Sequence, residues 1–336
     1  MVDPMNRRTG RPVAVVTGAS RGLGFLLARE FRRQGYDLVI CARSEDGLDA
    51  ARVDLDPTGT HVVAVRADVS VRAEAERVIA AAMERFDRLD VLVNNAGVIQ
   101  VGPVVTMTAQ QFEDALGSML WGAVHTSLAA IPVMRALGGG RIATITSVGG
   151  KLPAPHLLPY TTAKFAATGF SEGLRVELAK YGISVTTVVP GLMRTGSPRN
   201  ALFTGSRSAE YRWFTLGDSL PLLSMDAERA ARVIVSGVLR GRAEMVLTAA
   251  AKLGVLVHGV APGLFMKVAA LADRLLPMGE DGAPPTPGHR EEAGQPAWFR
   301  FATRLTSAAA RRFHEQDDVT GTFRESEPHR EVHRVE

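Results

Sequence analysis

The sequence predicts an α/β fold: a doubly wound, seven-stranded parallel sheet in three layers, followed by a C-terminal helical extension. Between residues 13 and 247, short apolar runs alternate with helical stretches, which is the rhythm of repeated βαβ units. The runs are apolar at successive positions, as expected for strands that helices cover on both faces. Strands are expected at residues 13–17, 37–41, 61–65, 91–94, 141–146, 183–189 and 244–247.

Helical patterns fill the segments between these strands and continue past the last one. The clearest lie at residues 22–34, 73–86, 108–137 and 159–181. We divide the chain into a disordered leader (1–11), a main domain (12–248) with a lid at about 192–223, and an apolar helical extension (249–276). A linker rich in Pro and Gly (277–296) and a final segment (297–336) follow, the latter with a helix at 297–314 and a disordered tail.

The composition is that of an ordinary globular protein. Hydrophobic residues make up 46% of the 336 positions, charged residues 22%, and the formal net charge is +4. Because Lys and Arg do not cluster with interleaved aromatic residues, the sequence argues against a nucleic-acid-binding face. Cys41 is the single cysteine, so no intramolecular disulfide can form, and we expect a reducing, cytoplasmic setting. No metal site is expected.

A glycine-rich turn follows the first expected strand. Residues 17–24 read TGASRGLG and open a helix. Glycines in such a turn let the backbone approach a diphosphate, and the free N–H groups of the helix N-terminus attract anions. A tight turn without a ligand would show the same glycines, so this feature alone leaves both interpretations open. The residues expected to bind a dinucleotide here are Gly18, Ser20, Arg21, Gly22, Leu23 and Gly24.

The end of the second expected strand indicates which dinucleotide would bind. An NAD-binding site usually carries an acid there, about twenty residues after the glycines, to hold the ribose 2′-hydroxyl. This chain has Arg43 at that place and a second cation, Arg21, in the glycine turn. Two guanidinium groups without a carboxylate suit a 2′-phosphate. The pattern therefore predicts NADP(H).

Three further residues form a candidate catalytic set. Ser147 follows the fifth expected strand, and Tyr160 and Lys164 lie one helical turn apart at the start of a helix. A nearby ammonium favours the phenolate, so we expect Lys164 to lower the pKa of Tyr160 towards neutral pH. Tyr160 would then act as general acid or base on a carbonyl or alcohol, while Ser147 donates a hydrogen bond to the developing alkoxide.

Together these motifs resemble the short-chain dehydrogenase/reductase family over about residues 12–247. The matching features are TGxxxGxG at 17–24, NNAG at 94–97, Ser147, Tyr160-x-x-x-Lys164 and PG at 190–191. The resemblance implies a Rossmann-type catalytic domain, homo-oligomers that pair through two long helices, and a Lys164 that also binds the nicotinamide ribose. Epimerases and dehydratases are disfavoured because such relatives differ in glycine spacing. Further cofactor contacts implied by the resemblance are Asp68, Val69, Asn94, Ala96, Gly97, Pro190, Gly191 and Thr195.

One position departs from the family pattern. Where relatives usually carry an Asn that positions a water in a proton relay, this chain has Met119. Methionine is apolar and accepts hydrogen bonds only weakly, so it cannot reproduce that contact. Proton delivery then takes another route, through Ser118 or bulk water, or turnover is slow.

The expected lid and the C-terminal extension are both apolar. The lid favours a small hydrophobic carbonyl or alcohol substrate, although the same side chains would also serve to close the core; they are Leu202, Phe203, Tyr211, Trp213, Phe214, Leu216, Leu220, Leu222 and Leu223. His156 is expected to be a lone exposed residue. In the extension, Pro262 and two lysines argue against a spanning helix and favour two short helices, packed on the domain or resting on a membrane surface.

The sequence thus favours an NADP(H)-dependent oxidoreductase that interconverts a ketone or aldehyde and an alcohol. A second interpretation is an NADP(H)-binding regulatory or scaffold protein with weak or lost catalysis. Met119 and the long C-terminal extension prompt this alternative. Turnover of NADPH with apolar ketones would distinguish the two.

Overall fold

The computed structural model describes residues 10–220, 224–279, 284–292 and 294–315. Its centre is a seven-stranded sheet in which every neighbouring pair is parallel, in the order β3-β2-β1-β4-β6-β7-β11. The strands agree with the expected ones to within one residue at each end. They are β1 (Val13–Thr17), β2 (Asp37–Ala42), β3 (Val62–Arg66), β4 (Val91–Asn94), β6 (Gly140–Ile145), β7 (Ile183–Val189) and β11 (Glu244–Val246).

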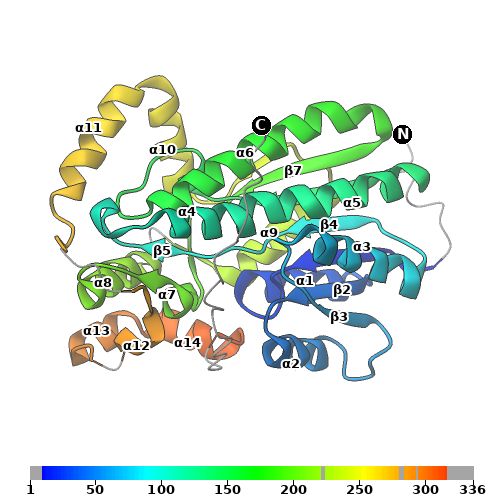
Figure 1. The fold of residues 1–336 in the computed structure, drawn as a ribbon, viewed down its shortest axis with the longest axis horizontal. Helices are drawn as coiled ribbons and strands as arrows, with labels where there is room; N and C mark the ends of the chain where they lie inside the picture. Colours follow the sequence, from blue (N-terminus) through cyan, green and yellow to red (C-terminus); the bar gives the residue numbers. More distant parts are fainter. Residues whose placement is uncertain (1–9, 221–223, 280–283, 293, 316–336) are drawn as a thin grey trace, which may run out of the picture.

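Helices cover both faces of this sheet, which confirms the three-layer prediction (Figure 1). Successive side chains of a strand point to opposite faces, so Val13 and Val15 join one core cluster while Ala14 and Val16 join the other. This is why the strands are apolar at every position. One face carries α1 (Gly22–Arg33), α2 (Glu45–Leu55) and α9 (Ala227–Leu239); the other carries α3 (Arg72–Phe86), α5 (Gly122–Ala136) and α6 (Leu158–Leu178).

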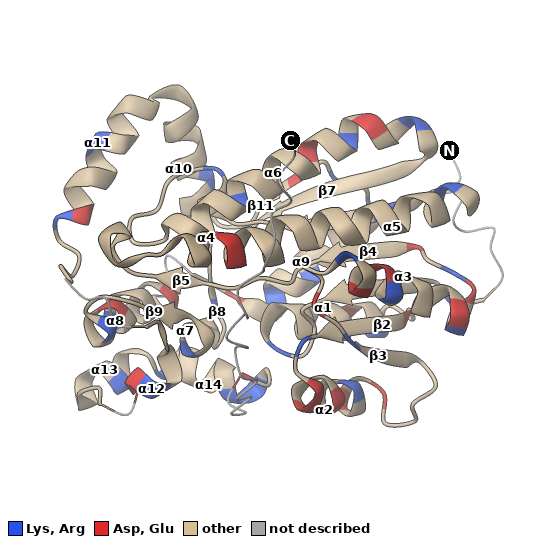
Figure 2. Cartoon of the chain, in the orientation of Figure 1, with Lys and Arg blue, Asp and Glu red and all other residues tan. Residues whose placement is uncertain are grey.

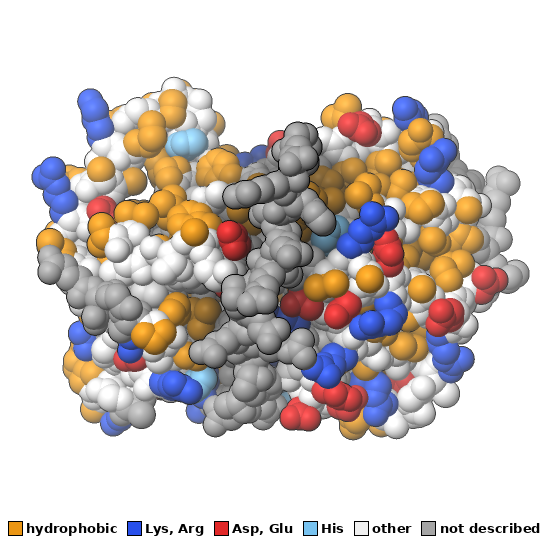
Figure 3. Space-filling model, in the orientation of Figure 1, with side chains coloured by type: hydrophobic (Ala, Val, Ile, Leu, Met, Phe, Trp, Pro, Cys, Tyr) orange, Lys and Arg blue, Asp and Glu red, His pale blue; other side chains and the backbone are white. Residues whose placement is uncertain are grey.

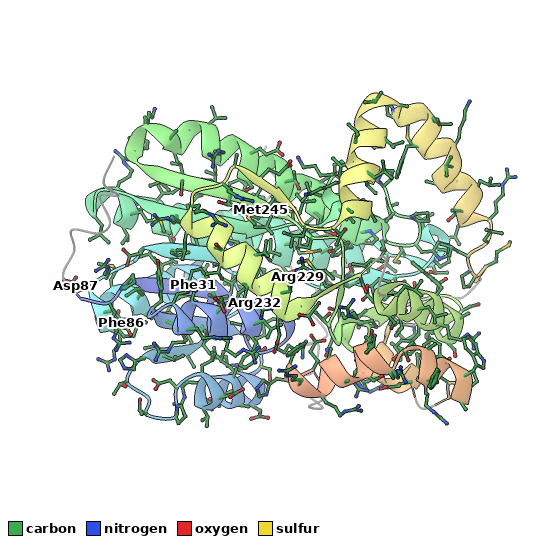
Figure 4. All side chains as sticks on the ribbon, turned by 180° about the vertical axis from the view of Figure 1, so that it is seen from behind. Phe31, Phe86, Asp87, Arg229, Arg232 and Met245 are labelled. Carbon is green, nitrogen blue, oxygen red and sulfur yellow. The ribbon has the colours of Figure 1, made fainter. Side chains whose placement is uncertain are left out.

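The pairing of α1 with α9 shows how a helix divides core from solvent. Phe31 of α1 is fully buried against the sheet. On α9, Arg229 and Arg232 are exposed and Ala230 is buried. From behind, α9 lies across the molecule with both arginines labelled along it and Phe31 beside it on α1 (Figure 4). Burial on one side of each helix is the amphipathic pattern expected of a covering layer.

A continuous helix of 28 residues, Ala109–Ala136, is long and apolar enough to cross a membrane, and no other described helix passes that test. It consists of α4 (Ala109–Leu116), one π-helical turn (Gly117–Trp121) and α5. It packs against α3 and α6 in the helical layer, which is the place of a core helix in a globular domain. The prediction of one long helix at 108–137 is confirmed, except for the π turn.

The lid and the C-terminal segments build a second, smaller core beside the sheet. It contains Phe203, Tyr211 and Phe214 from the lid and Phe299 from the C-terminal segment. The predicted linker at 277–296 is wrong in part. Residues 286–287 form a strand that pairs with the lid, and residues 288–292 form a short helix. The elements are β5 (Gln100–Val101), β8 (Leu192–Arg194), α7 (Ser197–Asn200), β9 (Leu202–Phe203), α8 (Arg207–Ser219), β10 (Ser224–Asp226), β12 (Thr286–Pro287), α12 (Gly288–Glu292), α13 (Ala297–Ala302) and α14 (Arg304–Arg312).

The apolar extension forms a helical hairpin, as predicted. Helix α10 (Ala249–Val260) ends at Ala261, and Pro262 begins α11 (Pro262–Asp273) at the position where its missing N–H costs nothing. Short 3₁₀ turns lie at Val104–Thr106, Val148–Gly150 and Ala179–Tyr181. The predicted disordered leader, apart from residues 10 and 11, and the predicted disordered tail at 316–336 lie outside the described residues.

Candidate active site

The glycine turn lies at the carboxyl end of β1, where the strand order reverses between β1 and β4. Open α/β sheets bind ligands at this crevice. Gly18 and Gly22 have φ angles of +64° and +58°, which favour glycine over any residue with a Cβ. Gly24 faces the turn itself, since a Cβ there would lie 2.1 Å from the Gly18 carbonyl oxygen. The three glycines are therefore required by backbone geometry.

Asn95 holds this turn in place, a role that the sequence interpretation missed. Its side-chain amide donates to the carbonyl oxygens of Thr17 (3.0 Å) and Gly18 (3.2 Å). In return, the Thr17 hydroxyl accepts from the backbone N–H groups of Asn95 (3.0 Å) and Ala96 (3.1 Å). The loop after β4 is thus bonded to the loop after β1. Asn95 lies in the NNAG motif, but the sequence interpretation named only the other three residues of that motif.

Arg21 and Arg43 come together beside the glycine turn. Burial lowers the pKa of the Arg21 guanidinium, Glu315 opposes that shift, and the positive charge of Arg43 adds to it. Two cations that interact this closely, without an acid on the second strand's end, form a site for an anion. The 2′-phosphate that would bind here stays a prediction.

Two of the other residues expected near the adenine, Asp68 and Asn94, make hydrogen bonds within the protein. Asp68 accepts from the backbone and hydroxyl of Ser70 at 3.0 and 2.7 Å, before α3. The Asn94 amide donates to Ser127 (3.0 Å) and accepts from Thr126 (2.6 Å), so its side chain anchors α5 to β4. The expected cofactor contacts of Asp68, Val69, Asn94, Ala96 and Gly97 stay predictions.

Ser147, Tyr160 and Lys164 meet at the carboxyl end of β6. The Ser147 hydroxyl lies close enough to the Tyr160 phenol to influence its pKa, and it accepts from the Gly149 backbone at 3.1 Å. The Lys164 ammonium lies 5.6 Å from the centre of the Tyr160 ring and donates to the Ile145 carbonyl oxygen at 2.8 Å. The three side chains therefore form the cluster that their spacing predicted.

The predicted direction of the Tyr160 pKa is wrong in this structure. Burial raises the pKa of Tyr160 to about 12; the hydrogen bond with Ser147 opposes the shift, and the charge of Asp218 adds to it. Burial also lowers the pKa of Lys164 to about 8. Desolvation disfavours the charged form of each group and is the largest cause of both shifts. At neutral pH, Tyr160 is consequently a protonated acid.

Met119 fills the space beside these residues. It is 3% exposed and packs with Ala163 and Tyr160 in a small apolar cluster. The narrow cavity between Met119, Ser118 and Ile145 has no room for a water molecule. Ser118 Oγ is buried there without a hydrogen-bond partner among the described residues. Met119 and its neighbours therefore leave no space for a water in this cavity.

The loop after β7 closes the crevice from the other side. The Pro190 carbonyl accepts from the Val148 backbone at 2.7 Å, which joins this loop to the Ser147 loop. A Cβ on Gly191 would lie 2.3 Å from Thr248 Oγ1, so glycine permits close approach of the α10 cap. Thr195 is 2% exposed, and its hydroxyl lies 2.5 Å from that of Ser197. All three expected residues therefore lie at this edge of the sheet.

His156 corrects another expectation, because it is neither alone nor exposed. Its side chain is 7% exposed, and its Nδ1 lies 2.9 Å from a carboxylate oxygen of the fully buried Glu210. Glu210 also accepts from Trp213 Nε1 at 2.6 Å, and Asp273 of α11 lies 3.5 Å from His156 Nε2. This network joins the loop before Tyr160 to the lid helix α8 and to the hairpin. Its partners are 54 and more residues away, so sequence spacing gave no signal.

The lid contributes less to the site than expected. Phe203, Tyr211 and Phe214 are buried in the second core, with Trp213 and Leu216 packed partly against it. Leu202 is 8% exposed in the small sheet, Leu220 is half exposed, and Leu222 and Leu223 lie outside the described residues. The interpretation of these residues as core closure is therefore the correct one for most of them.

Asp218 of the lid was missed by the sequence interpretation. It is 5% exposed, and burial, together with Glu315, raises its pKa to about 8.

Comparison with known proteins agrees with this geometry. The family model for short chain dehydrogenases matches residues 12–202. The chain is 35% identical over 233 residues to 11-beta-hydroxysteroid dehydrogenase A of Sesamum indicum. The aligned region covers 68% of this chain and 66% of that protein. Among solved structures, actinorhodin polyketide ketoreductase with NADPH has a TM-score of 0.62 and 28% identity, covering 71% of this chain and 96% of that one.

A second solved structure holds the other nicotinamide cofactor. A short chain dehydrogenase/reductase from Burkholderia phymatum in complex with NAD has a TM-score of 0.70 and 25% identity, covering 76% of this chain and 95% of that one. Neighbours of similar fold thus hold either dinucleotide, so the fold alone does not choose between them. With its parallel sheet, its glycine turn and its Ser147, Tyr160 and Lys164 cluster, the chain belongs to the short-chain dehydrogenase/reductase family of oxidoreductases.

Proposed function

We propose that the protein is an NADP(H)-dependent oxidoreductase that interconverts a ketone and an alcohol on a small apolar molecule. The observation that carries this proposal is the Ser147, Tyr160 and Lys164 cluster beside the glycine turn. When bound, the nicotinamide donates or accepts the hydride. The turn and the cations Arg21 and Arg43 suit a phosphorylated dinucleotide.

The cluster supplies the proton and stabilises charge. Because the raised pKa keeps Tyr160 protonated at neutral pH, its hydroxyl donates a proton to the carbonyl oxygen as that oxygen gains negative charge. Ser147 donates a hydrogen bond to the same oxygen. Lys164 then stabilises the resulting phenolate until a proton from solvent restores the phenol. For alcohol oxidation, the phenolate accepts the hydroxyl proton instead.

An apolar substrate fits the surroundings of Tyr160. Val98, Leu116 and Met119 belong to the same small apolar cluster as Tyr160, and burial raises the pKa of Asp218 to about 8, which favours its uncharged form. A named hydroxysteroid dehydrogenase among the relatives supports the same substrate class.

Homo-oligomerisation is also supported, since α5 and α6 carry exposed apolar side chains including Leu128, Phe165 and Val176. Hydrophobic side chains gather over this region (Figure 3).

Replacing Tyr160 by Phe tests the catalytic role directly. Removal of the proton donor should lower turnover of NADPH with apolar ketones by about 10²- to 10⁴-fold. In the unchanged protein, the reduction rate should fall as pH rises through about 8, where Lys164 loses its charge. Tyr181→Phe is the matched control, because Tyr181 lies half-exposed at the far end of α6. Dinucleotide binding with no turnover by the unchanged protein would favour the scaffold alternative.

Replacing Arg43 by Ala tests the choice of dinucleotide. Loss of a charge-assisted contact to a 2′-phosphate should raise the Kd for NADPH by about 10- to 100-fold and leave the Kd for NADH unchanged. Arg33→Ala, at an exposed arginine of α1, should change neither constant. Equal losses for both dinucleotides would contradict the NADP(H) preference. Fluorescence titration measures all of these constants.

Replacing Met119 by Asn tests whether the missing relay limits turnover. Asparagine is smaller than methionine and polar, so it opens space for a water next to Ser118 and Ile145. The carbonyl oxygen of Ile145 accepts a hydrogen bond from Lys164. We expect kcat to rise, with little change in KM. The apolar variant Met119→Leu should leave kcat unchanged. If Met119→Asn keeps or lowers kcat, the protein does not depend on this path.

The α10–α11 hairpin is proposed to rest on a membrane surface. Leu253, Leu256, Val260, Leu264 and Leu271 are each at least 60% exposed. Figure 2 shows few charges along the hairpin, and the cations Lys252, Lys267 and Arg274 are exposed on it. Apolar area flanked by cations suits the surface of an anionic bilayer.

Sedimentation with anionic vesicles tests the hairpin's role. The full chain should cosediment with phosphatidylglycerol-containing vesicles, and the double variant Leu256→Glu with Leu264→Glu should stay in the supernatant. As a control, Val105→Glu changes a valine outside the hairpin that is as exposed as Val260, and this variant should still bind the vesicles. If the unchanged chain and all variants stay wholly soluble, membrane association is excluded under these conditions.

A further inference from the structure

The end of the described chain returns to the start of the fold. Helix α14 packs on the lid helix α8, where Ser219 and Thr306 share a 2.6 Å hydrogen bond. Beyond α14, Phe313 is 3% exposed and joins the main core, and the His314 ring meets the Phe25 ring of α1 edge-on at 4.6 Å. In Figure 1, α14 leads from α8 towards α1. Residues 313–315 are therefore packed against the N-terminal end of α1.

This segment uses a backbone donor of the glycine turn. The Gly22 N–H, the first of α1, donates to the Phe313 carbonyl oxygen at 2.9 Å. Free N–H groups at a helix N-terminus are the donors that bind diphosphate oxygens in dinucleotide sites. One of these donors is already bonded to the chain's own C-terminal segment.

A carboxylate follows at the same place. Glu315 is 5% exposed, and Arg21, the Gly196 backbone and Arg199 each favour its charged form, while its Oε2 has no hydrogen-bond partner among the described residues. A Cβ on Gly22 would lie 2.5 Å from its Oε1, and one on Gly196 would lie 2.6 Å from its Oε2. The carboxylate thus lies between the glycine turn and the loop after β7, among donors and cations from both.

We propose that residues 313–315 are a tethered ligand of the diphosphate subsite, in which Glu315 stands in for a phosphate and competes with the dinucleotide. The inference rests on the proposed function, since it needs a dinucleotide to compete with. The segment holds the Gly22 N–H, which a diphosphate would need, and the Arg21 guanidinium, which a 2′-phosphate would need, so the segment and the dinucleotide cannot bind there at once. Cofactor binding therefore requires residues 313–315 to leave, and their departure opens the crevice.

Burial of Glu315 opposes the charge that its cationic neighbours favour. Burial raises the pKa of Glu315 to about 7 in spite of its cationic neighbours, and Asp218 is the second carboxyl group that interacts with it. A diphosphate has more charge and more oxygens for the same donors. The apparent Kd for the dinucleotide equals the intrinsic Kd divided by the open fraction, so a segment closed nine-tenths of the time weakens binding about tenfold.

The first test is a charge reversal at the end of the segment. Glu315→Lys places a cation against Arg21 and should free the segment, so that NADPH binds about tenfold tighter than to the unchanged full chain. Glu84→Lys makes the same change at an exposed site on α3 and should leave the Kd unchanged. An unchanged or weaker affinity in Glu315→Lys overturns the proposal.

Hydrogen exchange on the unchanged protein gives a second readout that needs no variant. NADPH should slow amide exchange at residues 18–24 and speed it at residues 310–315. Protection at 18–24 with no change at 310–315 overturns the tethered ligand while leaving the proposed function intact. If neither NADPH nor NADH binds any of the proteins, the proposed function fails, and the competition fails with it.

Discussion

The bond between the loops after β1 and β4 is the constraint on which the rest of the site depends. Asn95 and Thr17 exchange hydrogen bonds through side chain and backbone, and Asn95 also holds the Gly18 carbonyl. This fixes the glycine turn at the switch point of the sheet, from which α1 begins with its first N–H groups directed at an anion site. The position of Arg21, and of everything that binds beside it, follows from that bond.

Local pattern was enough to predict the main sheet and its helices. The strand at Val13 to Val16 is apolar at every position because helices cover both faces of the sheet. A continuous apolar run of this kind therefore indicates a buried parallel strand. The catalytic cluster was predictable for a similar reason, since a one-turn spacing puts Tyr160 and Lys164 together on any helix. What these two predictions share is that they depend on neighbours in the sequence.

Predictions that depended on environment were less successful. Lys164 does lie near Tyr160, but Lys164 is buried and Tyr160 partly buried, and desolvation raises the pKa of the tyrosine to about 12. The network of His156 with Glu210 and the pairing of residues 286–287 with the lid were invisible, because their partners are distant in the chain. Burial and long-range pairing are properties of the folded molecule, so no spacing rule could supply them.

The C-terminal segment shows the same limit at the largest separation. Nothing in the sequence around Phe313 or Glu315 indicates an anion that reaches Gly22, because the contact joins segments that lie far apart in the sequence. Yet the physical requirement was present in the motif: a turn rich in donors and flanked by two arginines is unfavourable when left without an anion. A carboxylate from the protein itself meets this requirement at a cost, since its burial opposes its charge. The same features that make the site suited to a dinucleotide therefore also explain why the chain's own acid lies in it.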